Sequence, residues 1–364
     1  MRILILCKRQ YTGRDLLNDR YGRLYALPIG LAARGHNVVV VTSSYRKRGA
    51  VNRIEDGVRW CSIDLLPWPF AIEMAWQAIG EAFKPDVVVA SSDAPHLIWG
   101  ARFAHRMERP IVLDFYDDYE AFGLTRLPGL CRALRKACVR ADAVMAVSGA
   151  LADMLPSRGI DQQRIHLLEN GVPFDFALKM NREEARRELR LPAEVPLVGT
   201  AGALTTSRGI GDLLKAVDLL QKQRPDLRLV LAGPRDAVLS STMPPNTIDL
   251  GHLSHAMVAV LFRALDVGVI CNRDGAFARA CYPMRLAEMV ASGTPVVAAD
   301  LGEVSRLLMT RPDARYSPGY PDTLATRIAV QLDAPRPLDP ALAKDWPLLS
   351  ARLEAILEGV LKSR

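Results

Sequence analysis

The chain lacks the features that identify several large classes of protein. Its six cysteines form no C-x-x-C pair and have no zinc-like spacing with the six histidines, so we expect reduced thiols and no metal site. No apolar run reaches the ~20 residues that a membrane-spanning helix needs. The apolar part of the opening MRILILCKRQ is too short for a signal peptide. These absences predict a cytoplasmic protein.

Aromatic residues are also scarce, at 6%, and the basic residues do not alternate with them. A groove for single-stranded nucleic acid would require that alternation, so we expect no nucleic-acid partner. The formal charge of +7 therefore favours anionic ligands or an anionic membrane surface. Hydrophobic residues at 49% and charged residues at 24% are typical of an ordered globular protein.

Short β-branched runs alternate with amphipathic segments, in two series separated by a pause near Asn170. The first series lies at 3–6, 37–42, 86–91, 110–115 and 142–148, and the second at 195–202, 227–233, 246–251, 267–272 and 295–300. Such runs predict parallel strands with crossover helices, and 364 residues fit two domains better than one. We therefore expect an α/β fold with two doubly wound, Rossmann-like domains at 1–171 and 172–345. They would face one another across a ligand-binding cleft at the carboxyl ends of the strands.

The tail at 346–364 carries the pattern of an amphipathic helix. Its apolar side chains are Trp346, Leu349, Leu353, Ile356 and Val360, spaced for one face. This helix either closes the C-terminal domain or returns to the N-terminal one.

The segment GTAGALTTSRGIGDLLKAV, 199–217, follows a predicted strand and opens a helix. Gly202 lets the backbone approach a ligand, and the N–H groups at a helix start favour an anion such as a diphosphate. Arg208 adds a fork of donors for phosphate oxygens. The spacing is not GxGxxG, so a nicotinamide cofactor is not indicated. The alternative is a plain turn.

The segment CYPMRLAEMVASGTPVVAAD predicts a helix over 284–291, with Pro283 in its first turn and Gly293 after its end. Arg285 and Glu288 share an edge of that helix because residues three apart are neighbours. They form either an ion pair worth a few tenths of a kcal/mol or two contacts to one ligand.

Three carboxylates, Asp117, Asp118 and Glu120, crowd the loop FYDDYEAFG after a predicted strand of the first domain. Such crowding perturbs a pKa or holds a sugar hydroxyl, although a solvated acidic loop is equally consistent. The two adjacent aspartates lack a third ligand for a metal. His96 also follows a strand and is either a base or a structural residue.

Two basic segments complete the candidates in the first domain. The loop at 11–23, with Gly13 and Arg14, lies between a strand and its helix, a position suited to an acceptor's polar groups or to covering a surface. The segment RLPGLCRALRKACVR, 126–140, predicts a basic amphipathic helix that lies on anionic lipid or packs on the sheet.

In its order of motifs the chain resembles the GT-B nucleotide-sugar glycosyltransferases, specifically glycosyltransferase family 4. The matching pieces are RGHNVVVVT, ADAVMAVSGALADML, ENGVPFDF, AGALTTSRGIGDLLKAV, LRLVLAGP and PMRLAEMVASGTPVV. The resemblance implies transfer of a sugar from a nucleotide diphosphate sugar to a glycan or lipid-linked acceptor, with retention of configuration and without a metal or other cofactor. The expected pathway is cell-surface polysaccharide, lipopolysaccharide or glycolipid synthesis, on the inner face of the plasma membrane.

The resemblance also implies roles for particular residues. Glu288 aligns with the second glutamate of the family's Glu-x7-Glu motif, which holds the donor ribose. Arg208 and Arg285 would face the diphosphate, and Gly202 would approach the phosphates. Two positions depart from the family pattern: the first glutamate is Ala280 and the arginine after the loop glycine is Ala203. Asp274 is our candidate to replace that glutamate.

On the acceptor side we expect Gly13, Arg14, His96 and Glu120 to bind the acceptor and Asp117 or Asp118 to steer its hydroxyl. Two other functions remain open. A non-hydrolysing sugar-nucleotide epimerase uses the same two-domain fold, but would need a paired acid and base. A non-enzymatic carbohydrate-binding module would need neither Arg208 nor Glu288.

Overall fold

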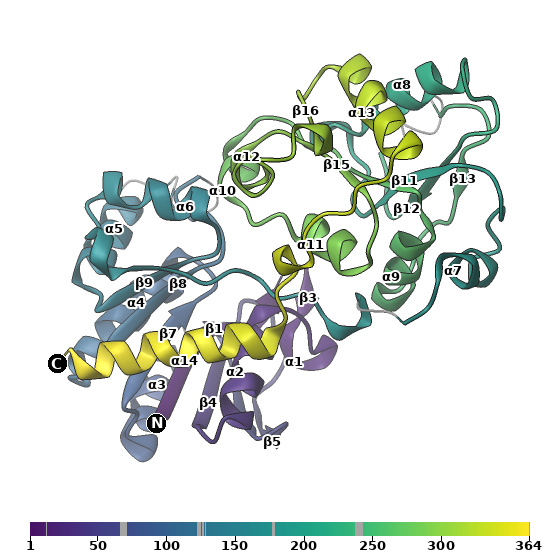
Figure 1. Ribbon diagram of the computed structural model, residues 1–364. Helices are drawn as coiled ribbons and strands as arrows, with labels where there is room; N and C mark the ends of the chain where they lie inside the picture. Colours follow the sequence, from purple (N-terminus) through teal and green to yellow (C-terminus); the bar gives the residue numbers. More distant parts are fainter. Residues whose placement is uncertain are drawn as a thin grey trace. The chain divides into compact units, whose positions relative to one another are not determined.

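The computed structural model describes residues 1–11, 13–65, 71–121, 125, 127, 129–176, 179–236 and 243–363 (Figure 1). By their internal contacts these residues divide into two compact units. Unit 1 comprises Met1–Gly171, Ala280–Tyr282 and Trp346–Arg364, and unit 2 comprises Val172–Arg279 and Pro283–Asp345. Within the described ranges, no helix is both long and apolar enough to cross a bilayer.

Unit 1 is built on an eight-stranded sheet in the order β10-β9-β8-β7-β1-β4-β6-β5. All its neighbours pair in parallel except β5 and β6. The strands are β1 (Arg2–Lys8), β4 (Asn37–Ser44), β5 (Val51–Glu55), β6 (Val58–Asp64), β7 (Val87–Ser91), β8 (Ile111–Phe115), β9 (Ala143–Ala146) and β10 (Ile165–Leu167), beside a small hairpin of β2 (Gln10–Tyr11) and β3 (Arg14–Asp15). Each run predicted as a strand in this half of the chain overlaps one of these strands.

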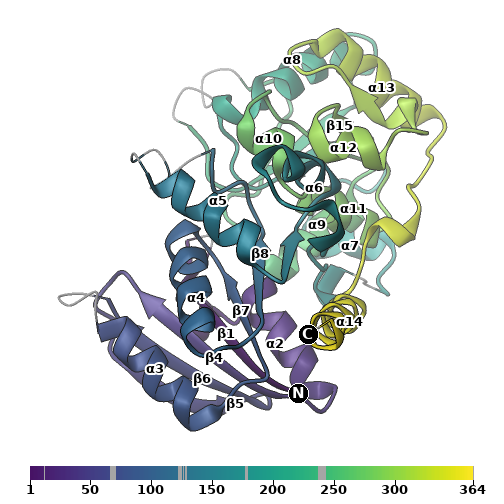
Figure 2. The same cartoon turned by 90° about the vertical axis from the view of Figure 1, so that its left-hand side faces the viewer.

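Helices cover both faces of this sheet (Figure 2). They are α1 (Leu16–Asp19), α2 (Arg23–Ala33), α3 (Ala71–Phe83), α4 (Ala94–Arg106), α5 (Leu130–Arg140), α6 (Gly149–Met154) and α14 (Trp346–Lys362). Successive side chains of β1 point to opposite faces of the sheet. Ile3 and Ile5 lie in the core under α2 and α14. Helices α3 and α4 pack on the other face. All five core residues of β1 from Ile3 to Cys7 are buried, as expected for a parallel strand covered on both sides.

The antiparallel hairpin β5–β6 at the sheet edge was not predicted. Its turn is Asp56-Gly57, and both residues have positive φ, 50° and 75°, which is the requirement of a tight type I′ hairpin turn. The Asp-Gly pair between two β-rich runs is a local signal from which this hairpin could have been predicted. β5 is the last strand at this edge of the sheet, and its middle residues are exposed.

Unit 2 has a six-stranded, all-parallel sheet in the order β13-β12-β11-β14-β15-β16. Its strands are β11 (Leu197–Ala201), β12 (Arg228–Ala232), β13 (Ile248–Asp249), β14 (Val267–Ile270), β15 (Val296–Ala299) and β16 (Arg315–Tyr316). Its helices are α7 (Arg182–Glu188), α8 (Ile210–Gln221), α9 (His255–Ala264), α10 (Ala276–Ala280), α11 (Met284–Ala291), α12 (Gly302–Leu307) and α13 (Pro321–Asp333). The predicted helix over 284–291 is confirmed, with Pro283 at its N-cap rather than inside its first turn.

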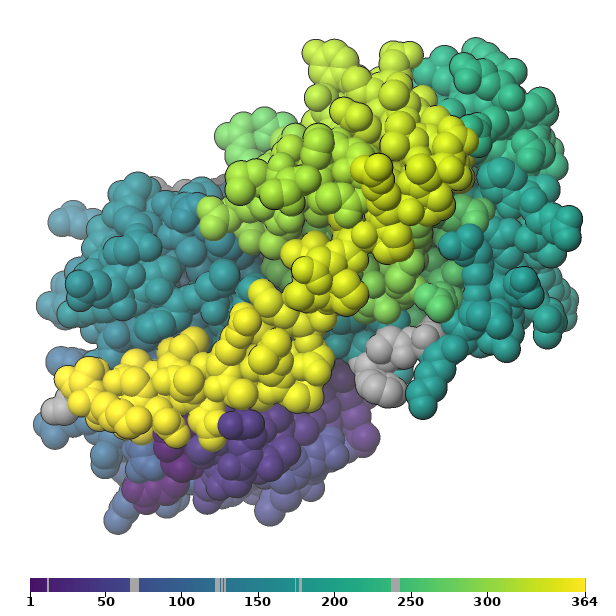
Figure 3. Space-filling model, viewed as in Figure 1, coloured from purple at the N-terminus to yellow at the C-terminus, as the bar shows by residue number. Residues whose placement is uncertain are grey.

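The C-terminal helix α14 packs along α2 in unit 1 (Figure 3). Leu349, Leu353, Leu357 and Val360 lie in the same hydrophobic cluster as Ile3 and other residues of β1, α2 and β4. Ile356, expected on the apolar face, is only partly buried, and Leu357 takes the buried position instead. The packing is close, because a side chain on Gly30 of α2 would overlap Ser350.

A fully buried arginine joins three segments of unit 1. Arg23, the first residue of α2, has no exposed surface and forms a two-pronged ion pair with Asp114 of β8, at 2.7 and 3.2 Å. Its Nη1 also donates to the Leu168 carbonyl at 3.1 Å and to Asn170 Oδ1 at 2.9 Å. Nearly all of its donors are thereby satisfied, which a buried guanidinium requires.

Replacing Arg23 with methionine should therefore lower the free energy of unfolding by about 3–5 kcal/mol, because Asp114 would remain buried without its partner. Urea denaturation measures the change. The matched control is Arg2→Met, which removes a 3.0 Å ion pair to Asp86 at the protein surface and should cost less than about 1 kcal/mol. Equal losses in the two variants would contradict the structural importance of the buried pair.

Candidate functional site

Two glycines bring the backbones of neighbouring strands together at the carboxyl edge of the unit 2 sheet. Gly202 follows β11 and Gly233 follows β12, with φ of 117° and 123°, angles that favour glycine. The Gly202 N–H donates to the Ala232 carbonyl at 2.8 Å, and a side chain on Gly233 would overlap the backbone of Gly202. The loops after β11 and β12 therefore have no room for side chains at Gly202 and Gly233.

Arg285 lies directly against this glycine loop. Its guanidinium donates from Nη1 to the carbonyl of Ala201, the last residue of β11, and a Cβ on Gly202 would overlap the same guanidinium. The side chain is half-buried. The first turn of α11 and the end of β11 thus place a permanent positive charge at the carboxyl edge of the sheet.

Arg208 provides a second guanidinium from the short 3₁₀ turn Thr206–Arg208, just before α8. Its Cζ lies 4.6 Å from the centroid of the Phe277 ring in α10, a cation–π contact that orients the side chain at modest energy. Arg208 is exposed. Gly209 is the N-cap of α8 with φ of 75°, so the helix starts where the sequence predicted an anion-binding turn.

Glu288 is on the same helix as Arg285 but has a different partner. It is 6% exposed, and its Oε1 lies 3.5 Å from Nε2 of His255 at the start of α9. The His255 ring in turn packs edge-on against Phe176, with centroids 4.9 Å apart. Arg285 and Glu288 are thus held by separate neighbours, and the interpretation as a simple intrahelical ion pair does not describe them. Sequence analysis missed His255, whose partner is distant in sequence.

Two carboxylates lie near Ala278 and Arg279 of α10. Asp274 is exposed and accepts two hydrogen bonds from Arg279, both of 2.7 Å, which hold its pKa below the usual value. Glu303, in the first turn of α12, is only 4% exposed. Its neighbour Gly302 packs against the carbonyl of Ala278. Sequence analysis named Asp274 and missed Glu303, a buried carboxylate near the same segment.

In unit 1, arginines bind two carboxylates of the predicted acidic loop. Arg158 holds both carboxylate oxygens of Asp118, at 2.7 and 2.9 Å, and Arg135 binds Glu120 at 2.7 Å. Asp117 Oδ1 accepts the N–H of Asp118 at 2.8 Å. Phe122 and Gly123 of this loop lie outside the described residues. The structure therefore pairs Asp118 and Glu120 with arginines, and their roles toward an acceptor stay predictions.

His96 is fully buried, with Nδ1 at 2.6 Å from Oδ1 of Asp93, the N-cap residue of α4. Burial acts to raise the pKa of Asp93, but the His96 charge and hydrogen bonds outweigh it and hold the pKa at about 2. The rings of Tyr45 and Trp76 lie within 6.2 Å of His96. His96 is thus buried among aromatic rings and held by Asp93, and its contact with an acceptor stays a prediction.

Gly13 and Arg14 are exposed residues of the hairpin formed by β2 and β3, and Arg14 is the first residue of β3. Arg14 stacks over Tyr21 at 4.3 Å. Tyr21 belongs to an aromatic cluster that sequence analysis missed, in which Tyr11 contacts both Tyr21 and Tyr116 at 6.2 and 5.1 Å. Tyrosines combine an apolar face with a polar tip, which suits sugar rings.

The basic segment at 126–140 forms α5, although Arg126 and Pro128 lie outside the described residues. Its buried side chains are Leu134 and Cys138, four residues apart. Leu127 and Val139, expected on the apolar face, are 58% and 47% exposed. Leu127 precedes the helix, which begins at Leu130, and Val139 lies beside the face that Leu134 and Cys138 bury. Among the described residues, no group of three or more His, Cys, Asp or Glu is arranged to hold a metal ion.

The fold of the chain is similar to that of glycosyltransferases of known structure. Anabaena HepE, solved in complex with UDP, superposes with a TM-score of 0.71 at 16% identity, covering 100% of this chain and 99% of that one. The shared fold is GT-B. Residues 23–176 match the model of Glycosyltransferase Family 4, and residues 195–333 match that of Glycosyl transferases group 1. The chain therefore belongs to the family 4 glycosyltransferases of GT-B fold, and the resemblance predicted from the sequence is confirmed.

The curated relatives match only part of the chain. The D-inositol 3-phosphate glycosyltransferase of Pseudarthrobacter chlorophenolicus is 29% identical over 44% of this chain and 40% of its own length. The lipopolysaccharide core biosynthesis mannosyltransferase LpsB of Rhizobium meliloti is 28% identical over 46% of this chain and 48% of its own length. The chain thus spans about half the length, or less, of these relatives.

Gly202→Ala should lower the free energy of unfolding by about 1–3 kcal/mol, because it forces a non-glycine residue into a strained conformation and displaces Arg285. Urea denaturation measures this loss. The control is Gly211→Ala in α8, where an added methyl group meets no atom within 4 Å and helix propensity favours alanine. If Gly202→Ala were as stable as Gly211→Ala, the tight packing of the loop would be refuted.

Proposed function

We propose that the protein transfers a sugar from a nucleotide diphosphate sugar to a glycan or lipid-linked acceptor, and that unit 2 binds the donor. The observation that carries this proposal is the position of Arg285, whose guanidinium lies against the Gly202 loop at the carboxyl end of β11. Parallel α/β sheets bind ligands at that edge. A fixed positive charge beside a glycine loop suits a diphosphate.

Arg208 and Arg285 would then bind the diphosphate, with Gly202 allowing its close approach and Glu288 accepting the ribose hydroxyls. His255 lies 3.5 Å from Glu288 and would orient that carboxylate toward the ribose. Asp274 remains our candidate for the sugar contact, and Glu303 joins it because it is buried near the same segment.

The proposed chemistry needs stabilisation of a leaving group more than proton transfer. Breaking the bond between sugar and phosphate builds negative charge on the departing diphosphate. Arginines held in place before the reaction stabilise that charge more in the transition state than in the ground state. Arg208, oriented by Phe277, and Arg285 would act in this way without a metal, and the product would retain the configuration of the donor.

The acceptor-binding residues are proposed in less detail than the donor-binding ones. Asp117 follows the carboxyl end of β8, and Gly13 and Arg14 belong to the β2–β3 hairpin that follows β1. Tyr21 and Tyr116 add rings on which a sugar could stack. The names of the relatives, one acting on inositol phosphate and one on the lipopolysaccharide core, support an acceptor in cell-surface glycan or glycolipid synthesis. The UDP bound to HepE makes UDP-sugars the first donors to test.

Arg208→Ala and Arg285→Ala should each lower kcat about a hundredfold, because one lost contact to the developing charge costs ~3 kcal/mol. Product formation from a radiolabelled UDP-sugar and a glycan acceptor measures the effect. Lys215→Ala is the matched control, since Lys215 is an exposed cation on α8 of the same unit, and should keep full turnover.

Two results would speak against this mechanism. Full turnover in both arginine variants would remove the leaving-group role. Interconversion of a UDP-sugar with its epimer in the absence of any acceptor would favour the sugar-nucleotide epimerase instead.

Glu288→Ala should weaken nucleotide binding at least tenfold, since the two hydrogen bonds to the ribose from a charged acceptor would be lost. Isothermal titration calorimetry with UDP measures the affinity. Glu183→Ala, an exposed carboxylate on α7 of the same unit, serves as control. An unchanged dissociation constant in Glu288→Ala would show that the carboxylate does not bind the ribose.

A further inference from the structure

Ser92, directly after β7, has a backbone conformation that serine rarely adopts. Its φ is 95°, whereas the other described non-glycine residues with positive φ have values between 48° and 59°, close to the ordinary left-handed region. A residue in a sparsely populated conformation persists only where its surroundings impose it, and such residues cluster at active sites and ligand-binding sites. The fold therefore holds Ser92 against its own conformational preference.

Two hydrogen bonds from neighbouring strand ends hold Ser92 in place. The N–H of Lys8, the last residue of β1, donates to Ser92 Oγ at 2.8 Å. The hydroxyl of Tyr116, which follows β8, donates to the Ser92 carbonyl at 3.0 Å. Ser92 itself is only 1% exposed. The ends of three strands thus determine the direction in which the chain continues to Asp93.

The carboxylate of Asp93 is held at both of its oxygens. Oδ1 accepts the N–H of His96 at 3.0 Å and lies 2.6 Å from His96 Nδ1, and Oδ2 accepts the hydroxyl of Tyr45 at 3.0 Å. The Asp93 side chain is nevertheless 21% exposed. A carboxylate oxygen has two lone pairs, and Tyr45 is the one partner of Oδ2 among the described residues. Oδ2 can therefore accept a second hydrogen bond from a ligand.

Tyr45, which follows β4, provides an aromatic ring beside this carboxylate. The residue is 38% exposed. Its hydroxyl is bound to Asp93, and its ring packs edge-on against His96 with centroids 5.9 Å apart. The ring is thus fixed in orientation and still accessible. A carboxylate beside an accessible ring suits a sugar, because hydroxyls bind to the carboxylate and the apolar C–H groups pack on the ring.

These residues lie where the topology of the unit 1 sheet favours ligand binding. β1 pairs with β4 on one side and with β7 on the other (Figure 2). The order of the strands reverses there, and open α/β sheets bind ligands at the carboxyl ends of the strands beside such a reversal. Tyr45 and Asp93 follow the carboxyl ends of β4 and β7.

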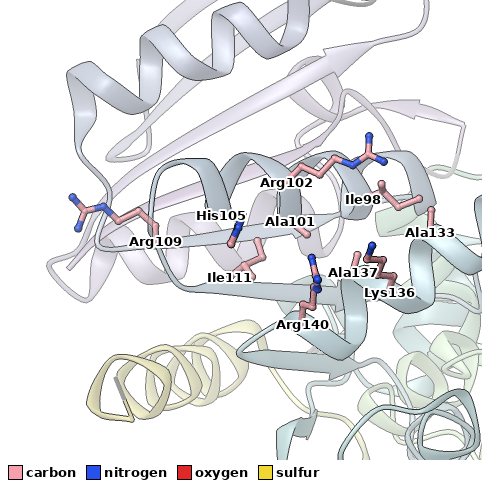
Figure 4. Close-up of a pocket in the computed structure, with 10 residues that line it drawn as sticks. All are labelled: Ile98, Ala101, Arg102, His105, Arg109, Ile111, Ala133, Lys136, Ala137 and Arg140. Carbon is pink, nitrogen blue, oxygen red and sulfur yellow. The ribbon is translucent and has the colours of Figure 1, made fainter.

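Helix α4 also borders a hollow of about 220 Å³ toward its C-terminal end, between α4, α5 and the start of β8 (Figure 4). The polar side chains that line it are basic, but Arg102 and Arg109 point away from it and from each other. Their charges do not converge on a ligand. The N-terminal end of α4, at Asp93, is therefore the better candidate for a binding site.

We propose that Asp93 and Tyr45 form a subsite for a sugar ring of the acceptor. Asp93 would accept a hydrogen bond from a sugar hydroxyl, and the ring of Tyr45 would pack against the C–H groups of the sugar. Ser92 is a positioning residue, because it acts through Asp93. The assignment rests on the proposed transfer to a glycan acceptor, and sequence analysis named none of these three residues.

The ionisation of Asp93 decides what it can do to that hydroxyl. Burial acts to raise the pKa, but the charge and hydrogen bonds of His96 hold it at about 2. A general base works best when its pKa lies near the working pH, so Asp93 would not remove the proton at neutral pH. Its role is to orient the hydroxyl as a permanent hydrogen-bond acceptor.

The test is saturation-transfer NMR of the full chain with the methyl glycosides of glucose, galactose, mannose and N-acetylglucosamine. The wild type should bind at least one of them. Asp93→Asn keeps a side chain that caps α4 well, and should weaken glycoside binding about tenfold or more because the charged acceptor is lost. The matched control is Asp86→Asn, which removes a partly exposed carboxylate just before the opposite end of β7 and should leave the affinity unchanged.

Variants of Tyr45 and Ser92 separate a binding role from a structural one. Tyr45→Ala should weaken glycoside binding about fivefold, and Tyr45→Phe, which keeps the ring, should weaken it less. Ser92→Gly removes the strain, since glycine adopts this φ readily, but also removes the bond to Lys8. It should leave the thermal midpoint nearly unchanged and weaken glycoside binding about threefold, because ordering the loosened Asp93 then opposes binding. A purely structural role for Ser92 would change the midpoint and not the affinity.

Donor binding is measured separately, by calorimetry with UDP. The UDP affinity should be the same in Asp93→Asn and in the wild type. If the wild type bound none of the glycosides, or if a folded Asp93→Asn or Tyr45→Ala variant bound them as tightly as the wild type, the subsite would be refuted. If the wild type bound a glycoside but not UDP, the proposed donor site would fail while the sugar subsite would stand.

Discussion

The buried pair of Arg23 and Asp114 is the interaction on which unit 1 most depends. Removing two charges from water costs several kcal/mol per ion, and only good geometry with further hydrogen bonds recovers that cost. Arg23 meets this condition because the Leu168 carbonyl and Asn170 accept its remaining protons, and Ser91 donates to Asp114 at 2.7 Å. The start of α2, the ends of β7 and β8 and the segment at 168–170 must therefore be correctly placed together.

In unit 2, close packing of backbone rather than a buried ion pair brings two strand ends together. Gly202 and Gly233 let two strand ends approach without side chains, and Arg285 occupies the space beside them. In the proposed function the same loop would lie against the diphosphate of the donor. Fold and proposed donor binding therefore rely on the same glycine.

The strands and the helix at 284–291 were predictable because their signals are local: β-branched runs, a proline before the helix and a glycine after it. The family's motifs also placed Arg208, Arg285 and Glu288 on the correct elements. Partners distant in sequence were not predictable. His255 near Glu288, Arg158 against Asp118 and the buried Glu303 depend on tertiary packing, which no spacing along one chain encodes. The β5–β6 hairpin was missed although its Asp-Gly turn is a local signal.

The position of α14 has a consequence for biosynthesis. Leu349, Leu353 and Val360 complete a core whose other members, such as Ile3 and Val38, are translated before unit 2. A ribosome adds residues one at a time, so this core stays exposed on one side while the whole of unit 2 is being made. Until α14 emerges, that apolar face of the N-terminal sheet is open to chaperones and to other nascent chains.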